Sequence, residues 1–249
     1  VGYRIGAGWV TPRDNIEIAA LFTRIEPSGG TSMTIPSPDD ANGVILPGLA
    51  KANRTSAHWN VKYSTLDVEF GRSYFLSRYF YLRPYFGSRS AWIVQWADLD
   101  FSGLSMDSLS ARLRNGFIGS GLRVGSDSKW FFARHWNLFF AGSLSALFGM
   151  FDVAARPTQD LTYALDADAS VYRIVPAAQT QIGLGWETNF AEDSNQIAIN
   201  IGYELNYWWR QNQLPAFEVL PESFAQIYGA RQSKDLAFHG MTVDIQLAF

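Results

Sequence analysis

The chain's candidates for chemistry are charged side chains that recur at alternate positions within apolar or small-residue segments. By this alternation, the charged residues predicted to share an inward, polar face are Lys62, Asp67, Glu69, Arg83, Arg89, Arg123, Arg173, Glu187, Glu204, Arg210 and Asp244. Two columns stand out, a basic one of Arg83, Arg89 and Arg123 and an acidic one of Glu187, Glu204 and Asp244. Such columns can tune ion selectivity across a wet constriction, or they can pair and fill the interior. Both interpretations stay open.

The motifs of common enzyme classes are missing. A hydrolase needs a histidine base beside a serine or an aspartate. Of the 3 histidines, His239 falls in an apolar set, His135 in a turn, and His58 near a loop end. The sequence has no nucleophile elbow, His-x-x-x-His pair, Walker motif or dinucleotide-binding glycine pattern. We therefore predict that the protein is not an enzyme and takes no cofactor.

Acidic residues gather in two predicted loops, Asp98, Asp100 and Asp107 in one and Asp160, Asp166 and Asp168 in the other. Such carboxylates can bind divalent cations, including ions that bridge lipopolysaccharide. Solvated loop charges are the commoner case, so we predict no metal site.

Composition narrows the class of protein. Charged residues make up 17% of the chain, against about 25% in soluble domains, while 15% are aromatic. The net charge of −3 offers no basic surface for nucleic acid, and the chain has no cysteine for disulfides or thiolate metal sites. The longest charge-free stretch, 136–151, is shorter than the roughly 18 to 20 residues of a spanning helix.

The period of the hydrophobic residues identifies strands. In 196–210, one set of alternate positions is apolar, namely Ile197, Ile199, Ile201, Tyr203, Leu205, Tyr207 and Trp209. Successive strand side chains point to opposite faces, so this segment has one apolar face and one polar face. The same reasoning predicts nine strands, at 2–10, 15–25, 57–70, 79–96, 113–125, 136–151, 171–189, 196–210 and 236–249. In 57–70 the apolar positions change from odd to even, which predicts a β-bulge near Ser64–Thr65.

Connections between the strands alternate in length. Short turns at 11–14, 71–78, 125–134 and 191–195 alternate with long loops at 26–56, 97–112, 152–170 and 211–235. Short periplasmic turns and long extracellular loops are typical of outer-membrane barrels. Antiparallel closure needs an even number of strands, so we expect a further strand before Val1. The prediction is an all-β protein: a single domain over 1–249, a transmembrane antiparallel up-and-down β-barrel of about ten strands, within a range of about 8 to 12.

Three features favour a membrane barrel over a soluble sandwich. Aromatic residues near strand ends would form interfacial girdles: Trp92, Trp96, Trp136, Trp186, Tyr207 and Trp209. Glycine and serine on the polar faces leave room inside a narrow barrel. The last strand ends on Phe249 and resembles the signal that the barrel assembly machinery reads.

Several segments resemble the Legionella/Chlamydia-type major outer membrane protein family. The most specific block is YSTLDVEFGRSYFLS at 63–77, with LRPYFG at 82–87 and AWIVQ at 91–95. Further matches are GYRIGAGW at 2–9, GWETNF at 185–190 and GYELNYWWRQNQ at 202–213. The resemblance implies an abundant pore-forming outer-membrane barrel and suggests a homotrimer. The lack of cysteines departs from the chlamydial branch, which cross-links its envelope through disulfides.

We therefore predict a porin that allows passive diffusion of ions and small hydrophilic solutes through a polar lumen. The alternative is a structural or adhesive surface protein with a side-chain-filled lumen, which would bind partners through its long loops. Expected partners are outer-membrane lipid and lipopolysaccharide, the barrel assembly machinery through the C-terminal strand, and small hydrophilic solutes, with no nucleic acid. The expected location is the bacterial outer membrane, with a chain that crosses it several times.

Overall fold

Long antiparallel strands make up almost all of the chain that the structure describes. The computed structural model of the 249 residues describes 1–34, 54–103, 106–157, 167–190, 195–213, 215–218, 228–231 and 233–249. The strands are β1 (Gly2–Val10), β2 (Ile16–Ile25), β3 (Ser28–Thr34), β4 (Arg54–Arg72), β5 (Tyr74–Ser77), β6 (Phe80–Gly103), β7 (Met106–Phe131), β8 (Trp136–Pro157), β9 (Ala167–Phe190), β10 (Asn195–Asn212), β11 (Pro215–Glu218), β12 (Tyr228–Arg231) and β13 (Lys234–Ala248). No helix among these residues is long and apolar enough to cross a membrane.

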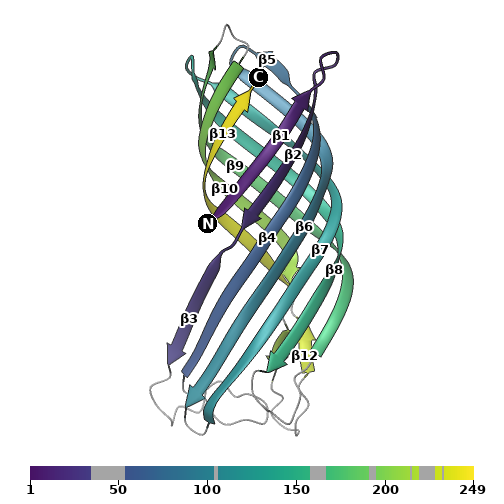
Figure 1. Ribbon diagram of the computed structural model, residues 1–249, viewed down its shortest axis with the longest axis vertical. Coiled ribbons are helices and arrows are strands. Elements are labelled where there is room, and N and C mark those ends of the chain that lie inside the picture. Colours follow the sequence, from purple (N-terminus) through teal and green to yellow (C-terminus); the bar gives the residue numbers. More distant parts are fainter. Residues whose placement is uncertain are drawn as a thin grey trace.

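One large sheet contains all but two of these strands. Nine of them follow one another as neighbours in the order β1-β2-β4-β6-β7-β8-β9-β10-β13, with β3 added beside β4 and β5 beside β6. Every neighbouring pair is antiparallel, and the sheet curls around a central lumen (Figure 1). This confirms the predicted all-β, up-and-down barrel class. The hairpin of β11 and β12 forms a separate small sheet.

Each of the nine predicted strands corresponds, in order, to one strand of this path. Four short strands, β3, β5, β11 and β12, were not predicted, because they lie in stretches read as turns or loops. The predicted turn at 125–134 was too long, since β7 continues to Phe131 and only 132–135 reverse the chain. Strands β6 to β9 also extend well past their predicted ends at the loop end of the barrel. On β6 and β7 the outward face there becomes charged while Ala97, Leu99 and Leu113 pack inward, so the apolar positions change faces although the strand continues.

The predicted β-bulge near Ser64–Thr65 was wrong. β4 pairs with both β2 and β6 in unbroken register through this point, and its odd positions stay inward from Val61 to Glu69. What changes is the chemistry of the two faces. The inward face changes from apolar at Tyr63 to acidic at Asp67, and the outward face from polar at Lys62 to apolar at Leu66. In the sequence, these two changes of surroundings look like a one-residue shift of the strand. The outward face passes from polar to apolar side chains where the membrane begins, and the inward face passes from apolar to acidic side chains.

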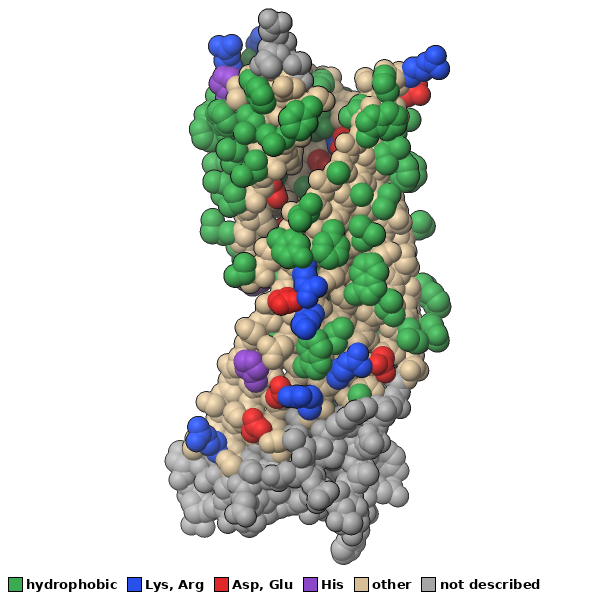
Figure 2. Space-filling model, in the orientation of Figure 1, with side chains coloured by type: hydrophobic (Ala, Val, Ile, Leu, Met, Phe, Trp, Pro, Cys, Tyr) green, Lys and Arg blue, Asp and Glu red, His purple; other side chains and the backbone are tan. Residues whose placement is uncertain are grey.

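The outer surface has an apolar band and a charged band. Figure 2 shows apolar side chains covering the end of the barrel with the short turns, and charged side chains toward the loop end. In the charged band, cross-strand ion pairs join Arg112 to Asp98 at 2.6 Å and Arg114 to Asp152 at 2.9 Å. The segment 80–96 of β6, which ends at the Trp96 level, is ~53 Å long, or roughly 37 Å along the membrane normal at a tilt of ~45°. The apolar band therefore matches a bilayer, and the strands continue beyond it into water.

Close approach of neighbouring strands requires glycine at Gly121 on β7. A Cβ there would overlap the carbonyl oxygen of Ala146 on β8, a backbone atom held by the sheet. Gly240 on β13 also faces inward, yet a Cβ there would meet nothing within 4 Å. These two glycines form a matched pair.

We predict that Gly121→Ala lowers the free energy of unfolding by about 1–3 kcal/mol, because added volume forces backbone shifts in a packed sheet. Gly240→Ala should stay within about 0.5 kcal/mol of the unsubstituted protein. Urea midpoints of the refolded barrel in detergent, followed by tryptophan fluorescence, would measure both. Equal midpoints for the two variants would contradict the close approach.

Candidate functional site: the lumen

A layer of buried ion pairs lines the lumen toward the turn end. The Arg89 guanidinium on β6 donates to both carboxylate oxygens of Asp67 on β4, at 2.6 and 2.7 Å. Arg123 on β7 lies 3.1 Å from Asp67 and 3.2 Å from Glu69. All four side chains are nearly inaccessible, and Arg89 is only 1% exposed. Buried charges are tolerable only when paired in this way.

Arg83 extends this layer toward the turns. Its guanidinium contacts three carboxylates, Glu17 at 2.8 Å, Glu69 at 3.3 Å and Asp127 at 2.8 Å. Nearer the rim, Lys129 pairs with Glu187 at 2.6 Å.

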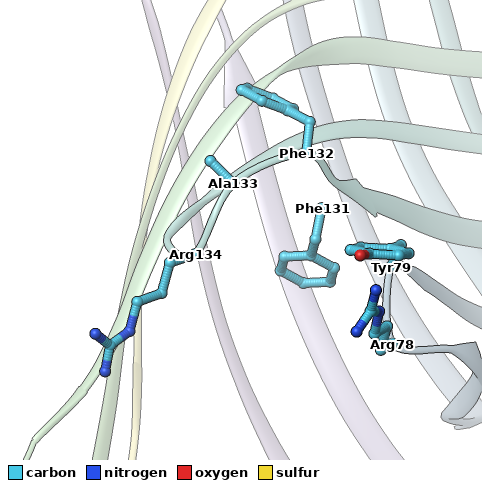
Figure 3. Close-up of a pocket in the computed structure, with 6 residues that line it drawn as sticks. All are labelled: Arg78, Tyr79, Phe131, Phe132, Ala133 and Arg134. Atoms are coloured by element: carbon cyan, nitrogen blue, oxygen red, sulfur yellow. The ribbon is translucent and has the colours of Figure 1, made fainter.

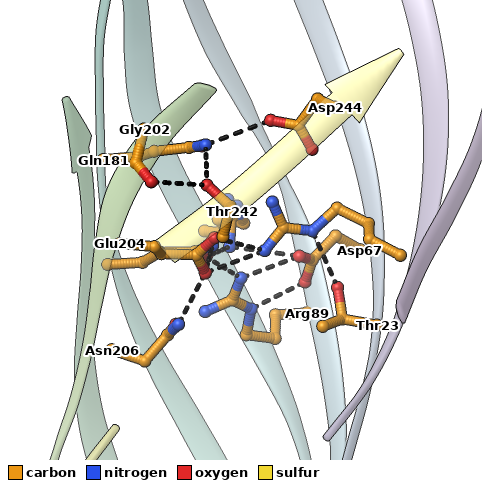
Figure 4. Close-up of polar contacts among 12 residues, drawn as sticks. Thr23, Asp67, Arg89, Gln181, Gly202, Glu204, Asn206, Thr242 and Asp244 are labelled. Carbon is orange, nitrogen blue, oxygen red and sulfur yellow. Dashed lines mark hydrogen bonds and ion pairs between the residues drawn. The ribbon is translucent and has the colours of Figure 1, made fainter. Parts of the chain in front are cut away.

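A second group of contacts surrounds Glu204 on β10. Arg4 on β1 donates to both of its carboxylate oxygens, at 2.8 and 3.0 Å, and Gln179 and Asn206 donate to it at 2.8 and 2.6 Å. Figure 4 shows Glu204 and Asn206 converging with Asp67 and Arg89 in the interior. Gln179 joins the two groups, because its side-chain oxygen accepts from Arg89 and Arg123.

The predicted basic and acidic columns do not pair with each other. Arg89 bonds to Asp67 and Arg83 to Asp127 on neighbouring strands, because the register places these residues opposite each other. Arg123 on β7 reaches Asp67 and Glu69 on β4, two strands away. The acidic column finds other partners: Glu187 pairs with Lys129, Glu204 with Arg4, and Asp244 accepts from Gln181 at 3.1 Å. Arg173 is half-buried, on the same face as buried Val175.

Two predicted inward charges lie elsewhere. Lys62 is exposed on the outer face, and its ammonium lies 5.3 Å from the centre of the Trp96 ring. The mistaken phase of β4 explains this error. Arg210 is exposed because the register of β10 shifts between Trp208 and Asn212, where Arg210 has a φ of 55°. This irregularity in β10 turns Arg210 away from the lumen.

Several partners in the ion-pair layer were missed by sequence reasoning. Asp127 and Lys129 fell within the overlong predicted turn, and Glu17 near the predicted start of its strand. Arg4 is the only charged residue in β1 and alternates with Gly2, Gly6 and Gly8, so its inward position was visible in the sequence.

Next to the ionic layer, toward the loops, the lumen contains an apolar layer that the sequence did not predict. Its buried members are Val61, Tyr63, Ala91, Ile93, Phe117, Leu147, Phe151, Val153, Val175, Ala177, Trp208 and Leu236. The rings of Tyr63 and Trp208 meet edge to face at 5.7 Å, and those of Phe117 and Phe151 lie 4.7 Å apart. At this height apolar side chains line and narrow the lumen.

Other buried polar atoms in the lumen have no protein partner among the described residues. They include both side-chain polar atoms of Gln95, Asn137 and Gln211, and the hydroxyls of Ser143 and Ser145. Buried amides and hydroxyls without partners are costly unless water bonds to them. These levels of the lumen are therefore polar enough to hold water.

The six predicted girdle aromatics, Trp92, Trp96, Trp136, Trp186, Tyr207 and Trp209, all take outward positions in their strands. Trp136 and Trp186 are register partners near the turn end, whereas Trp96 lies next to the charged band. Phe249 is 91% exposed at the end of the chain. Its role as an assembly signal stays a prediction.

The remaining sequence candidates do not form a site. Asp98 accepts from Arg112, and this hydrogen bond raises the pKa of the Arg112 guanidinium; Asp100 accepts from Ser110 at 2.6 Å. The other predicted acids, Asp107, Asp160, Asp166 and Asp168, have side chains outside the described part of the structure. Within that part, no three histidine or acidic side chains gather to hold a metal.

A small cavity of about 260 Å³ at the turn end is lined by Arg78, Tyr79, Phe131, Phe132, Ala133 and Arg134. The Arg78 guanidinium lies 4.4 Å from the centre of the Tyr79 ring, and Arg134 points away from it (Figure 3). Two cations that diverge in this way do not form an anion site.

A curled antiparallel sheet with an apolar exterior, a charged interior and outward aromatics at two heights defines an outer-membrane β-barrel. The family model described as the Legionella pneumophila major outer membrane protein precursor matches residues 1–249. The chain belongs to this family, which confirms the resemblance found in the sequence, and the family is one of outer membrane proteins rather than of enzymes. No curated protein and no solved structure matches the chain.

The buried Arg89–Asp67 pair and the exposed Arg112–Asp98 pair allow a matched test of the ion-pair layer. Both arginines donate Nε to an aspartate oxygen at 2.6 Å. We predict that Arg89→Met costs about 3 kcal/mol, because it leaves Asp67 buried with incomplete neutralisation. Arg112→Met should leave the urea midpoint unchanged, since water screens its pair. A small effect of Arg89→Met would show that Asp67 is hydrated or neutral.

Proposed function

We propose that this protein is a porin, a multi-pass outer-membrane barrel through which ions and small hydrophilic solutes diffuse passively. The observation that carries the proposal is the lining of the lumen: charged side chains from eight strands face inward, and amides such as those of Gln95 and Asn137 lack protein partners among the described residues. Amides and hydroxyls without protein partners are costly in a dry interior and are satisfied by water in a wet passage, which supports the porin. No catalytic step is assigned.

Selectivity in this proposal depends on the ion-pair layer. Arg83, Arg89 and Arg123 pair with Asp67 and Glu69, so this level of the lumen presents charges of both signs to a passing ion. Water on either side would hydrate the ion before and after this level. The short turns would face the periplasm and the long loops the outside.

We predict that the double variant Arg83→Ala with Arg89→Ala shifts selectivity toward cations, because it leaves Asp67 and Glu69 under-neutralised beside the passage. Single-channel recording in a planar bilayer, with the reversal potential in a salt gradient, measures this. Lys62→Ala is the control, since it removes a cation from the outer face and should leave the reversal potential unchanged. An unchanged potential in the double variant would remove both arginines from the constriction.

A second function, a closed structural or adhesive barrel, is favoured by the apolar layer around Trp208, Phe117 and Leu147. Apolar constrictions block ions by excluding water. In this case the barrel would anchor the long loops at the cell surface, where lipopolysaccharide and other partners would meet them.

Substitutions of two adjacent tryptophans distinguish the porin from the closed barrel. Trp208 is fully buried in the apolar layer, whereas Trp209 is 38% exposed on the outer face. We predict that Trp208→Ala raises single-channel conductance severalfold, because it opens the apolar level, while Trp209→Ala leaves conductance unchanged. Wild-type steps that grow in Trp208→Ala support a narrow porin. A folded wild type without steps supports the closed barrel, whether or not Trp208→Ala opens it.

The remaining partners are also proposals. Insertion by the barrel assembly machinery is supported by the apolar, alternating β13 that ends at Phe249. A homotrimer is supported by the wide apolar face alone, which lipid would cover equally well.

A further inference from the structure

Two buried carboxamides converge in the lumen near the turn end. Asn137 on β8 and Asn200 on β10 are both register partners of Gly185 on β9, so the three residues lie side by side on the inward face. Asn137 is completely buried and Asn200 is only 5% exposed. The side-chain oxygen of each has no hydrogen-bond partner among the described residues, so both acceptors are unsatisfied by protein.

Glycine at position 185 keeps the space between these two oxygens open. A Cβ built on Gly185 would lie 2.5 Å from the Oδ1 atom of Asn137 and 2.5 Å from the Oδ1 atom of Asn200. The two oxygens therefore point at the same place. An amide oxygen only accepts hydrogen bonds, so two of them converge without repulsion only around a hydrogen-bond donor or a cation.

Asp244 on β13 adds a negative charge beside this pair. It is the register partner of Asn200 and is half-buried on the same inward face, where the Cβ atoms of such partners are about 5 Å apart. Its carboxylate accepts from the side-chain amide of Gln181 at 3.1 Å (Figure 4), and no lysine or arginine of the described chain forms an ion pair with it. This carboxylate is therefore solvated or paired with something other than protein.

The other charged groups that face this region are already neutralised. Glu187 follows Gly185 by two positions on β9 and pairs with Lys129 at 2.6 Å. On the loop side, Arg4 pairs with Glu204 at 2.8 Å. Asp244 is thus the charge that remains, and it leaves the surroundings of the two amide oxygens negative.

We propose that Asn137, Asn200 and Asp244 form a binding site for a divalent cation with the ligand preferences of Ca²⁺. The site lies in the lumen between Glu204 and the start of β10 at Asn195. Ca²⁺ takes about 6–8 oxygen ligands from carboxylates, amide carbonyls and water, at about 2.3–2.6 Å. Two amide oxygens and a carboxylate are the protein share, and water that reaches the site beside half-buried Asp244 supplies the rest. A single carboxylate gives weak binding, with a Kd of about 10⁻⁴–10⁻³ M.

A bridging water is the other occupant that this geometry allows. It would donate to both amide oxygens, and it would need neither the charge of Asp244 nor any added metal. The two occupants are distinguished by whether a cation binds at this position and whether its affinity depends on that charge.

Terbium luminescence tests whether a cation binds. Tb³⁺ has nearly the ionic radius and the oxygen preference of Ca²⁺, and it emits when a nearby tryptophan is excited. Trp136 and Trp186 are the sequence neighbours of Asn137 and Gly185, so an ion held there would be sensitised. The complete protein, refolded in detergent without lipopolysaccharide, should give tryptophan-sensitised Tb³⁺ emission that millimolar Ca²⁺ removes. If no such emission is observed, the proposal is overturned and a bridging water remains.

Gly185→Ala locates the ion, because it fills the space and keeps all three ligands. The atoms that its Cβ would meet are the ends of two flexible side chains, unlike the backbone oxygen that faces Gly121, so the variant can fold with displaced amides. We expect Ca²⁺ affinity, measured by competition with Tb³⁺, to fall at least about tenfold. Gly240→Ala is the matched control, since its Cβ would meet nothing within 4 Å. Unchanged affinity in Gly185→Ala would reject this position for the ion.

Asp244→Asn gives an independent answer if Gly185→Ala does not fold. It keeps the shape of the side chain and removes the charge, so Ca²⁺ affinity should again fall at least about tenfold. Asp235→Asn on the same strand is the control, because Asp235 is exposed and bonds to Tyr207 and to the Arg210 amide. Equal affinities in these two variants would overturn the proposal. Neither readout measures ion flow, so the result is independent of porin activity.

Discussion

The need to pair every backbone N–H and C=O within hydrocarbon determines the rest of this structure. It explains why strands as long as Met106–Phe131 follow one another as antiparallel neighbours, since each short turn places the next strand beside the last. Once the sheet curls, alternation assigns every second side chain to the lumen. The lumen then has to accommodate charge, and it does so by pairing.

Distance decides how the charges pair. Neighbouring strands lie about 5 Å apart, so side chains opposite each other in register meet without spanning the lumen. Asp67 meets Arg89 and Asp127 meets Arg83 for this reason. The acids on the opposite side of the lumen have other partners, as Glu204 has Arg4, and Gln179 connects the two groups by bonding to both Arg89 and Glu204.

Sequence reasoning worked where the outer face met lipid and failed where it did not. All nine strands of the main path were predictable, because alternation between lipid and lumen leaves a strong period of two. Lys62 was wrongly predicted to face the lumen because it is polar and its neighbours Val61 and Tyr63 are apolar. In a membrane barrel that pattern suggests a polar residue inside and apolar residues outside, whereas here Lys62 faces outward and its neighbours face inward. The apolar layer was missed for the same reason: the period says that two faces differ, and not which of them is inside. At the end of β6 the period of two continues with the faces reversed, since Ala97 and Leu99 pack inward while Asp98 and Asp100 lie on the outer side.

The sequence by itself therefore determined which residues share a face, because the two-residue period of a strand is a local property. Tertiary structure decided which faces turn inward at each height, and which charges meet. Arg4 and Glu204, 200 positions apart, form their ion pair only because the curl of the sheet brings its two ends together. Such a contact depends on register summed over nine strands, and no local pattern records that sum.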